Sequence, residues 1–173
     1  MTSEGEGSAM LKFIKNYGLL VLMAAGFVTV IALSLMVEVK PQSLPSTPLQ
    51  VVKSDGSFLT YTAEVARTPE EINMGLMFRK EMPANHGMIF YVDPEREVNF
   101  WMKNTLIPLD MIFIGADGVI KHIHPMTKPH DLTQIPSLAP VKAVLEINGG
   151  EAQKNGIMIG DSVKHEILGN MTP

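Results

Sequence analysis

The strongest constraint on this chain is an apolar segment, YGLLVLMAAGFVTVIALSLMV, which spans residues 17–37 and contains no charged side chain. An α-helix rises about 1.5 Å per residue, so a helix of this length would span about 30 Å, the thickness of the hydrocarbon layer of a membrane. Lys12 and Lys15 lie just before it, and flanking basic residues favour the cytoplasmic side. The sequence therefore predicts an uncleaved transmembrane helix that contacts the lipid bilayer, with residues 1–16 as a cytoplasmic tail.

Two other interpretations of this segment stay open. A cleaved signal peptide is cut after small residues, and Ala32 and Ser34 could occupy those positions. The apolar run continues past them and exceeds the roughly 7–15 residues of a signal-peptide core, which favours the anchor. The third interpretation is a helix buried in a protein core. The uncleaved anchor and the cleaved signal peptide both place the remaining chain outside the cytoplasm. We therefore expect an inner (plasma) membrane protein with its C-terminal domain in the periplasm or outside the cell.

A spacer rich in proline and serine is predicted for residues 38–48, before an extracytoplasmic domain of residues 49–173. Pro41, Pro45 and Pro48 lie among serine and threonine residues. Proline removes backbone donors and favours extended conformations, which is typical of a semi-rigid linker. The alternative is an irregular edge segment that lies on the domain itself.

The amino-acid composition excludes several classes of protein and of functional site. Hydrophobic residues make up 46% of the chain, enough for a real core, and this excludes a wholly disordered protein. The absence of cysteine excludes disulfides, thiolate nucleophiles and Cys-ligated zinc. The net charge of −4 lacks the basic excess that nucleic-acid binders usually carry, so no nucleic-acid partner is expected.

The domain sequence predicts many short strands and two short helices. Thr68, Pro69 and Glu71 form a capping-box pattern for a helix that runs to about Leu76 or Met77. A second short helix follows Gly149-Gly150 and ends near Asn155. Strands are expected at 49–53, 58–66, 88–92, 98–102, 109–114, 119–124, 141–147 and 162–168. This pattern favours a mainly β domain, a single compact β-sandwich or jelly-roll-like barrel.

Several motifs resemble one known family. They are GLMFR (75–79), GMIFYV (87–92), FWMKNTLIPLDMIFI (100–114), DGVI (117–120), VLEINGG (144–150) and GIMIGD (156–161). These segments resemble the bacterial and archaeal family named domain of unknown function 192. The resemblance implies a compact β-rich fold, sandwich or jelly-roll-like, that is often exported or membrane-anchored, and it implies no reaction.

The densest group of candidate site residues lies in the motif FWMKNTLIPLD. Period-2 alternation places Trp101 and Lys103 on the same face of a strand. Asn104 favours a turn, and Asp110 returns on the next strand. An aromatic surface beside a cation and an amide would suit a small polar ligand. The alternative is structural, with Trp101 in the core, Asn104 in the turn and Lys103 paired with Asp110.

Arg79 and Glu146 are the supporting charges of this candidate site. Arg79 closes the first helix, where a cation complements the negative end of the helix dipole. Its guanidinium could also hold Asp110, Glu146 or a ligand carboxylate with two hydrogen bonds. Glu146 stands in the apolar strand VLEIN, where an unpaired inward carboxylate is costly. An internal ion pair with Arg79 or Lys103 is therefore the structural alternative.

Metal and cofactor sites have weak support in the sequence. His122 and His124 alternate on a strand and His130 follows in a loop, but without a fixed carboxylate partner they do not define a site. The many methionines between residues 74 and 126 are expected to pack in the core. No metal and no cofactor is predicted.

The sequence favours a binding module for a small polar ligand or an envelope component. One alternative is an envelope hydrolase that acts on glycans through Asp110 and Glu146, provided that burial separates their pKa values. No residue is assigned a catalytic role. Another alternative is a structural or assembly factor that docks a membrane partner. The polar, proline-containing stretch 125–140 is long enough to form a functional loop.

Overall fold

The computed structural model describes residues 10–18, Met23 and residues 40–171. The chain divides into two units, residues 1–39 and 40–173. In the first unit residues 10–18 are helical, and the predicted membrane segment 17–37 lies almost wholly outside the described residues. Among the residues that are described, none of the helices combines the length and the apolar character needed to cross a membrane.

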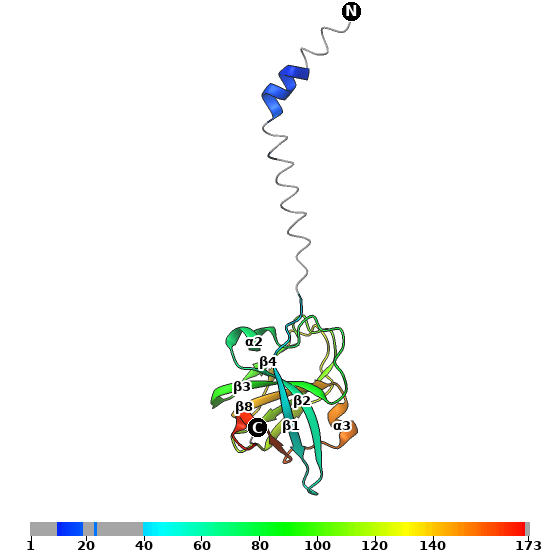
Figure 1. Ribbon diagram of the computed structural model, residues 1–173, viewed down its shortest axis with the longest axis vertical. Helices are drawn as coiled ribbons and strands as arrows, with labels where there is room; N and C mark the ends of the chain where they lie inside the picture. Colours follow the sequence, from blue (N-terminus) through cyan, green and yellow to red (C-terminus); the bar gives the residue numbers. More distant parts are fainter. Residues whose placement is uncertain (1–9, 19–22, 24–39, 172–173) are drawn as a thin grey trace, which may run out of the picture. The chain divides into compact units, whose positions relative to one another are not determined.

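The second unit is mainly β, as the sequence predicts (Figure 1). Its elements in chain order are β1 (Ser46–Val52), β2 (Phe58–Ala66), α2 (Pro69–Met74), β3 (His86–Arg96), β4 (Asn99–Phe100), β5 (Leu109–Ile114), β6 (Ile120–His124), β7 (Ile135–Pro136), β8 (Val141–Asn148), α3 (Glu151–Asn155), β9 (Ser162–Lys164) and the 3-10 helix η1 (Glu166–Leu168).

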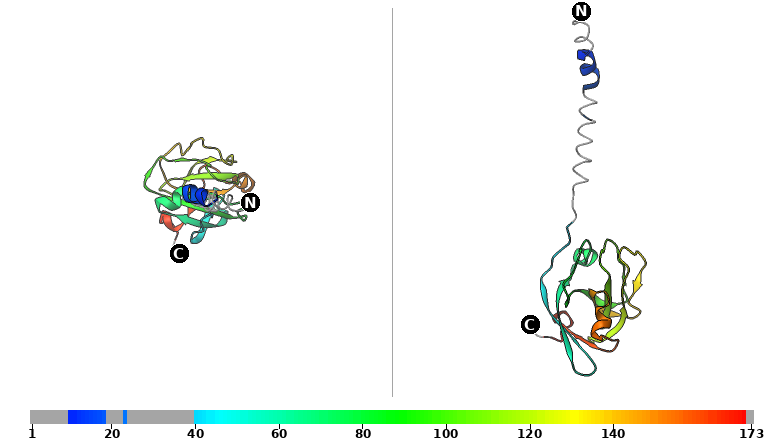
Figure 2. Two further views of the ribbon diagram at one scale, coloured as in Figure 1. Left: turned by 90° about the horizontal axis from the view of Figure 1, so that it is seen from above. Right: turned by 90° about the vertical axis from the view of Figure 1, so that its right-hand side faces the viewer.

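Seven strands form one sheet in the order β6-β5-β8-β3-β2-β1-β9, while β4 and β7 form a small second sheet. The pair β2–β3 is parallel and is connected through α2, whereas the other pairs are antiparallel. The two ends of the large sheet meet, because the Ile120 N–H donates to Asp161 at 2.8 Å and the Val163 N–H donates to Gly118 at 2.7 Å. The sheet therefore curls into a half-barrel (Figure 2).

This arrangement corrects the finer part of the fold prediction. The sequence predicted a sandwich or a jelly-roll-like barrel, and the structure has one curled sheet with a parallel pair inside it. A parallel pair needs a crossover connection, here the one that contains α2, which differs from the antiparallel connections of a jelly roll.

The first helix begins as its sequence predicts. The Thr68 side chain accepts a hydrogen bond from the Glu71 N–H, the Glu71 carboxylate accepts from the Thr68 N–H, and Pro69 occupies the first turn. The helix ends at Met74, earlier than expected, because Gly75 adopts a positive φ of 46° that a helix cannot continue. The next residues turn back toward the sheet and help to line the site described below.

Both faces of the central strands are covered. All six residues of β5 are buried, and alternate residues of β8 belong to different hydrophobic clusters, Leu145 to one and Val144 to the other. The first cluster includes Ile120 and Val163 from the two ends of the sheet, so it fills the inside of the curl. The second lies on the opposite face, beneath α2 and the segments around β4 and β7.

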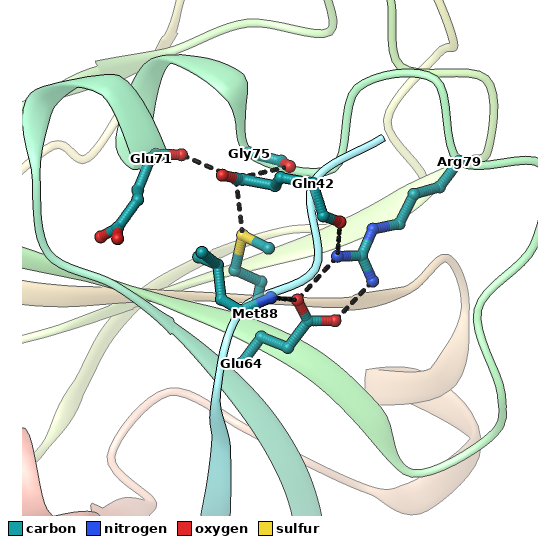
Figure 3. Close-up of polar contacts among 7 residues, drawn as sticks. Gln42, Glu64, Glu71, Gly75, Arg79 and Met88 are labelled. Atoms are coloured by element: carbon teal, nitrogen blue, oxygen red, sulfur yellow. Dashed lines mark hydrogen bonds and ion pairs between the residues drawn. The ribbon is translucent and has the colours of Figure 1, made fainter. Parts of the chain in front are cut away.

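Part of the predicted spacer belongs to the folded domain. Ser46 to Pro48 are the first residues of β1 and pair with β2. The Gln42 side-chain amide donates to the backbone oxygens of Glu71 at 2.8 Å and Gly75 at 2.9 Å (Figure 3). The chain from residue 42 onward thus lies on the domain. This agrees with the alternative interpretation of residues 38–48, an edge segment that lies on the domain.

The last predicted strand is shorter than expected. It ends at Lys164, because the ring of His165 accepts the Ile167 N–H and caps η1. The predicted strand 98–102 is reduced to Asn99–Phe100, which pairs with β7, a strand that the sequence did not indicate.

Candidate functional site

The side chain of Glu146 is the centre of the candidate site. In β8 it pairs with Met88 of β3 and with Met111 of β5, two fully buried residues that flank it on the same face of the sheet. Glu146 itself is only 5% exposed. Within the part of the chain that the structure describes, no side-chain N or O atom that is shut off from solvent lacks a hydrogen-bond partner. Glu146 accepts no hydrogen bond from these residues, so its oxygens border open space.

That open space is a pocket of about 280 Å³. Its wall is built from α2 and the turn after it (residues 72–77), Phe90 of β3, residues 99–101, and Gln134 from the loop before β7, together with Lys103 and Thr105. Phe90 and Phe100 meet edge to face, with ring centroids 5.2 Å apart. Glu146 is therefore the acidic group of a pocket whose lining mixes aromatic and aliphatic side chains with amide and hydroxyl groups.

Burial sets the protonation of this acid. Desolvation raises the pKa of the Glu146 carboxyl from 4.5 to about 8, and no neighbouring charge contributes to the shift. At neutral pH the group is mainly a neutral carboxylic acid. It can donate a hydrogen bond in that state, or become an anion when a cation reaches it.

Trp101 and Lys103 line the same pocket. Trp101 is 47% exposed, and the Lys103 ammonium lies 5.4 Å from the centre of its ring in a cation–π contact. Met102, between them, is buried on the other side. The alternation predicted for this segment is thus present, and it brings Trp101 and Lys103 to the pocket that contains Glu146. The core position predicted as the alternative for Trp101 is not what the structure has.

Asp110 lies elsewhere. It is fully buried and accepts three backbone hydrogen bonds, from the N–H groups of Met126 (2.8 Å), Gly150 (2.9 Å) and Ala152 (2.8 Å). Its neighbour Met111 pairs with Glu146, so Asp110 points to the opposite face of the sheet. Its role here is to hold the start of α3. The two carboxyl groups are not brought together, and Asp110 makes no ion pair with Lys103 or Arg79.

Arg79 is also held by structural contacts. Its guanidinium donates to both carboxylate oxygens of Glu64, at 2.6 and 2.8 Å, and to the backbone oxygen of Gln42 at 2.7 Å (Figure 3). Burial alone would raise the pKa of Glu64, but the hydrogen bonds from Arg79 and from the Leu44 N–H outweigh it and lower this pKa. The ion pair predicted for Arg79 with Glu146 or Asp110 is therefore wrong in its partner, which is Glu64.

Asn104 is a turn residue outside the pocket. Its φ is +54°, a conformation that asparagine tolerates better than most residues. Its backbone oxygen accepts the Phe78 N–H at 2.9 Å, and its side-chain amide lies 3.9 Å from the Met77 sulfur. Asn104 thus connects the segment after α2 to the segment that carries Trp101 and Lys103.

The histidines form no metal cluster in the described part of the chain, where no group of three or more potential His, Cys, Asp or Glu ligands occurs. The His122 ring stacks on Phe113, with centroids 5.6 Å apart, and burial followed by the charge of His124 lowers the pKa of His122. The methionines behave as predicted where they are buried: Met82, Met88, Met102 and Met111 pack in the second hydrophobic cluster.

Residues 50–165 match the family model DUF192, which is described as Uncharacterized ACR. The chain belongs to the DUF192 family. Among solved structures, it is similar to a protein of unknown function from Novosphingobium aromaticivorans, with 43% identity and a TM-score of 0.69, over 74% of this chain and 91% of that one. A Sinorhizobium meliloti protein, provisionally described as a transcription regulator, has 37% identity and a TM-score of 0.71, over 74% and 99% of the two chains. No curated protein matches the chain significantly.

The DUF192 domain also places residues in the pocket that sequence reasoning missed. They are Asn73 of α2, Asn99 of β4, Thr105 and Gln134. Gln134 lies in the stretch 125–140, whose length and polarity indicated a functional loop. For Asn73 and Asn99 the sequence carries no comparable signal, because single exposed amides are common on any protein surface.

Proposed function

We propose that this chain is a membrane-anchored, extracytoplasmic binding module for a small polar ligand or an envelope component. The observation that carries the proposal is the Glu146 carboxyl, which is buried, accepts no hydrogen bond from the described residues and borders a pocket of about 280 Å³. Ligand pockets are typically concave and mostly apolar, with a few convergent polar groups. Glu146, Thr105 and Gln134 supply such groups here.

The contrast among the buried charges supports a binding role. Asp110 and Arg79 are fully engaged by partners within the domain, as structural charges should be. Glu146 is desolvated by burial without such partners. A group of this kind is expected where an external molecule completes the contacts.

The hydrolase alternative receives no support from this geometry. It requires two carboxyl groups on either side of one scissile bond. Asp110 and Glu146 project from opposite faces of the sheet, and the Asp110 oxygens accept backbone hydrogen bonds at α3.

A fragment screen on the full chain in detergent tests the proposal. Ligand-observed NMR identifies fragments that bind, and the screen is repeated with Trp101→Ala and with Phe58→Ala, a matched aromatic control that is 60% exposed and outside the pocket. We expect Trp101→Ala to weaken the bound fragments roughly tenfold, because a stacked aromatic contact is lost, while thermal unfolding stays cooperative. Phe58→Ala should change neither property.

The proposal fails if no fragment binds, or if bound fragments are equally insensitive to both substitutions. Loss of cooperative unfolding in Trp101→Ala alone would instead show that Trp101 serves packing.

A further inference from the structure

We infer that the pocket takes a small organic cation, an amine with an apolar body, whose ammonium group pairs with Glu146. This inference rests on the proposed binding function and specifies the chemical class of the ligand. It starts from the unpartnered carboxyl, which accepts no hydrogen bond from the described residues.

The groups around Glu146 favour a cation over an anion. From the neighbouring strands it is flanked by Met88 and Met111, and the α2 segment contributes only uncharged side chains to the pocket. Lys103 is the only other charged residue in the pocket lining, and its ammonium lies over the Trp101 ring. A carboxylate ligand could accept a hydrogen bond from the protonated Glu146, but its countercharge would have to come from Lys103, whose ammonium already lies over the Trp101 ring.

The pocket walls suit the rest of such a ligand. The rings of Phe90 and Phe100 meet edge to face, and Trp101 adds a third aromatic side chain to the lining. Aromatic faces attract organic cations, and the attraction strengthens where water is excluded. The volume of about 280 Å³ suits a compact molecule.

Binding of an amine would release a proton, whereas binding of a neutral ligand would not. Glu146 is mainly protonated at neutral pH, so formation of the ion pair ionises it: an ammonium ion and the carboxylic acid give the ion pair and one proton, which the solvent takes up. Lys103 is the only other titratable side chain that lines the pocket. A hydroxyl ligand would instead use Glu146 in its neutral form and release no proton.

Three probes of matched shape test this inference on the full chain: benzylamine, benzyl alcohol and benzoate. Isothermal titration calorimetry at neutral pH, in two buffers of different ionisation enthalpy, measures the affinity and the number of protons released. We expect benzylamine to bind at least about tenfold more tightly than the other two, with release of about one proton. Glu146→Gln should remove both the preference and the release, whereas Glu81→Gln, an exposed matched control, should keep both.

The proton count is obtained on the unmodified chain, so it is decisive even if Glu146→Gln fails to fold. Equal or tighter binding of benzyl alcohol or benzoate, or amine binding without proton release, overturns the amine class and leaves the proposed binding function standing. Absence of binding by all three probes also overturns the inference. The proposed function is then decided by the fragment screen.

Discussion

At the scale of single residues, Glu146 should leave a signature in stability. Its carboxyl has a pKa of about 8 in the folded domain against 4.5 when exposed. Both states bind the proton below pH 4.5, but between 4.5 and about 8 only the folded state keeps it, so folding stability falls as pH rises through this window. Because one pKa unit corresponds to about 1.4 kcal/mol, the loss should reach a few kcal/mol.

Glu146→Gln should remove this loss, since the amide does not ionise. Thermal melts across the window should show the unmodified chain losing stability toward alkaline pH relative to the variant. Burial lowers the pKa of the His165 imidazole, so the folded domain loses stability as the pH falls. This loss is the same in both proteins and cancels when one stability profile is subtracted from the other. Parallel pH profiles for the two proteins would mean that Glu146 is solvated in solution.

Single residues of the candidate site also differ in how far the sequence predicted their positions. Strand alternation placed Trp101 and Lys103 on one face, as the structure has them, and the position of an acid inside an apolar strand drew attention to Glu146, which lines the same pocket. The partner of Arg79 was missed, because Glu64 lies on β2 and Arg79 lies in the crossover connection between the parallel strands β2 and β3. No local pattern reports a pairing that depends on a crossover.

At the scale of elements, Asp110 joins β5 to α3. We expect Asp110→Ala to destabilise the domain by about 3 kcal/mol or more, because the Asp110 side chain is fully buried and three backbone N–H groups lose their acceptor. Chemical denaturation measures the loss, and hydrogen exchange should rise at residues 149–157. The segment 72–77 should keep its protection, since it covers the opposite face of the sheet.

The surface pair Asp117–Lys121 offers the matched control. Asp117→Ala removes an exposed carboxylate that contacts Lys121 at 2.7 Å and accepts the Val119 N–H at 3.0 Å, and it should cost about 1 kcal/mol or less. Uniformly raised exchange in Asp110→Ala, in both segments alike, would contradict a local role at α3.

Element boundaries were predictable where local chemistry determines them. The capping box at Thr68 and the apolar run of β5 are examples, and β2 and β5 have the bounds that the sequence predicts. The two-residue strands β4 and β7 are too short to show any periodicity. The strand order, with β8 between β5 and β3, depends on contacts distant in sequence and could not be predicted.

At the scale of the whole molecule, the chain is proposed to consist of a folded domain and a membrane anchor at residues 17–37. We expect the full chain to sediment with membranes and to remain there after alkaline carbonate washing. Phe27→Lys combined with Ile31→Lys should release it, because each charge at the centre of a spanning helix costs roughly 3 kcal/mol. Phe58→Lys, in an exposed position of the domain, is the matched control and should leave the chain in the membrane fraction.

Sidedness and processing follow from the same preparation. An N-in anchor exposes the domain to protease added to spheroplasts, and N-terminal sequencing of the membrane-bound chain should find residues that precede the apolar segment. A mature chain that starts after Ser34 would establish the signal-peptide alternative. A domain protected in intact spheroplasts but cut after lysis would overturn the proposed orientation, and with it the expectation that the Glu146 pocket meets ligands outside the cytoplasm.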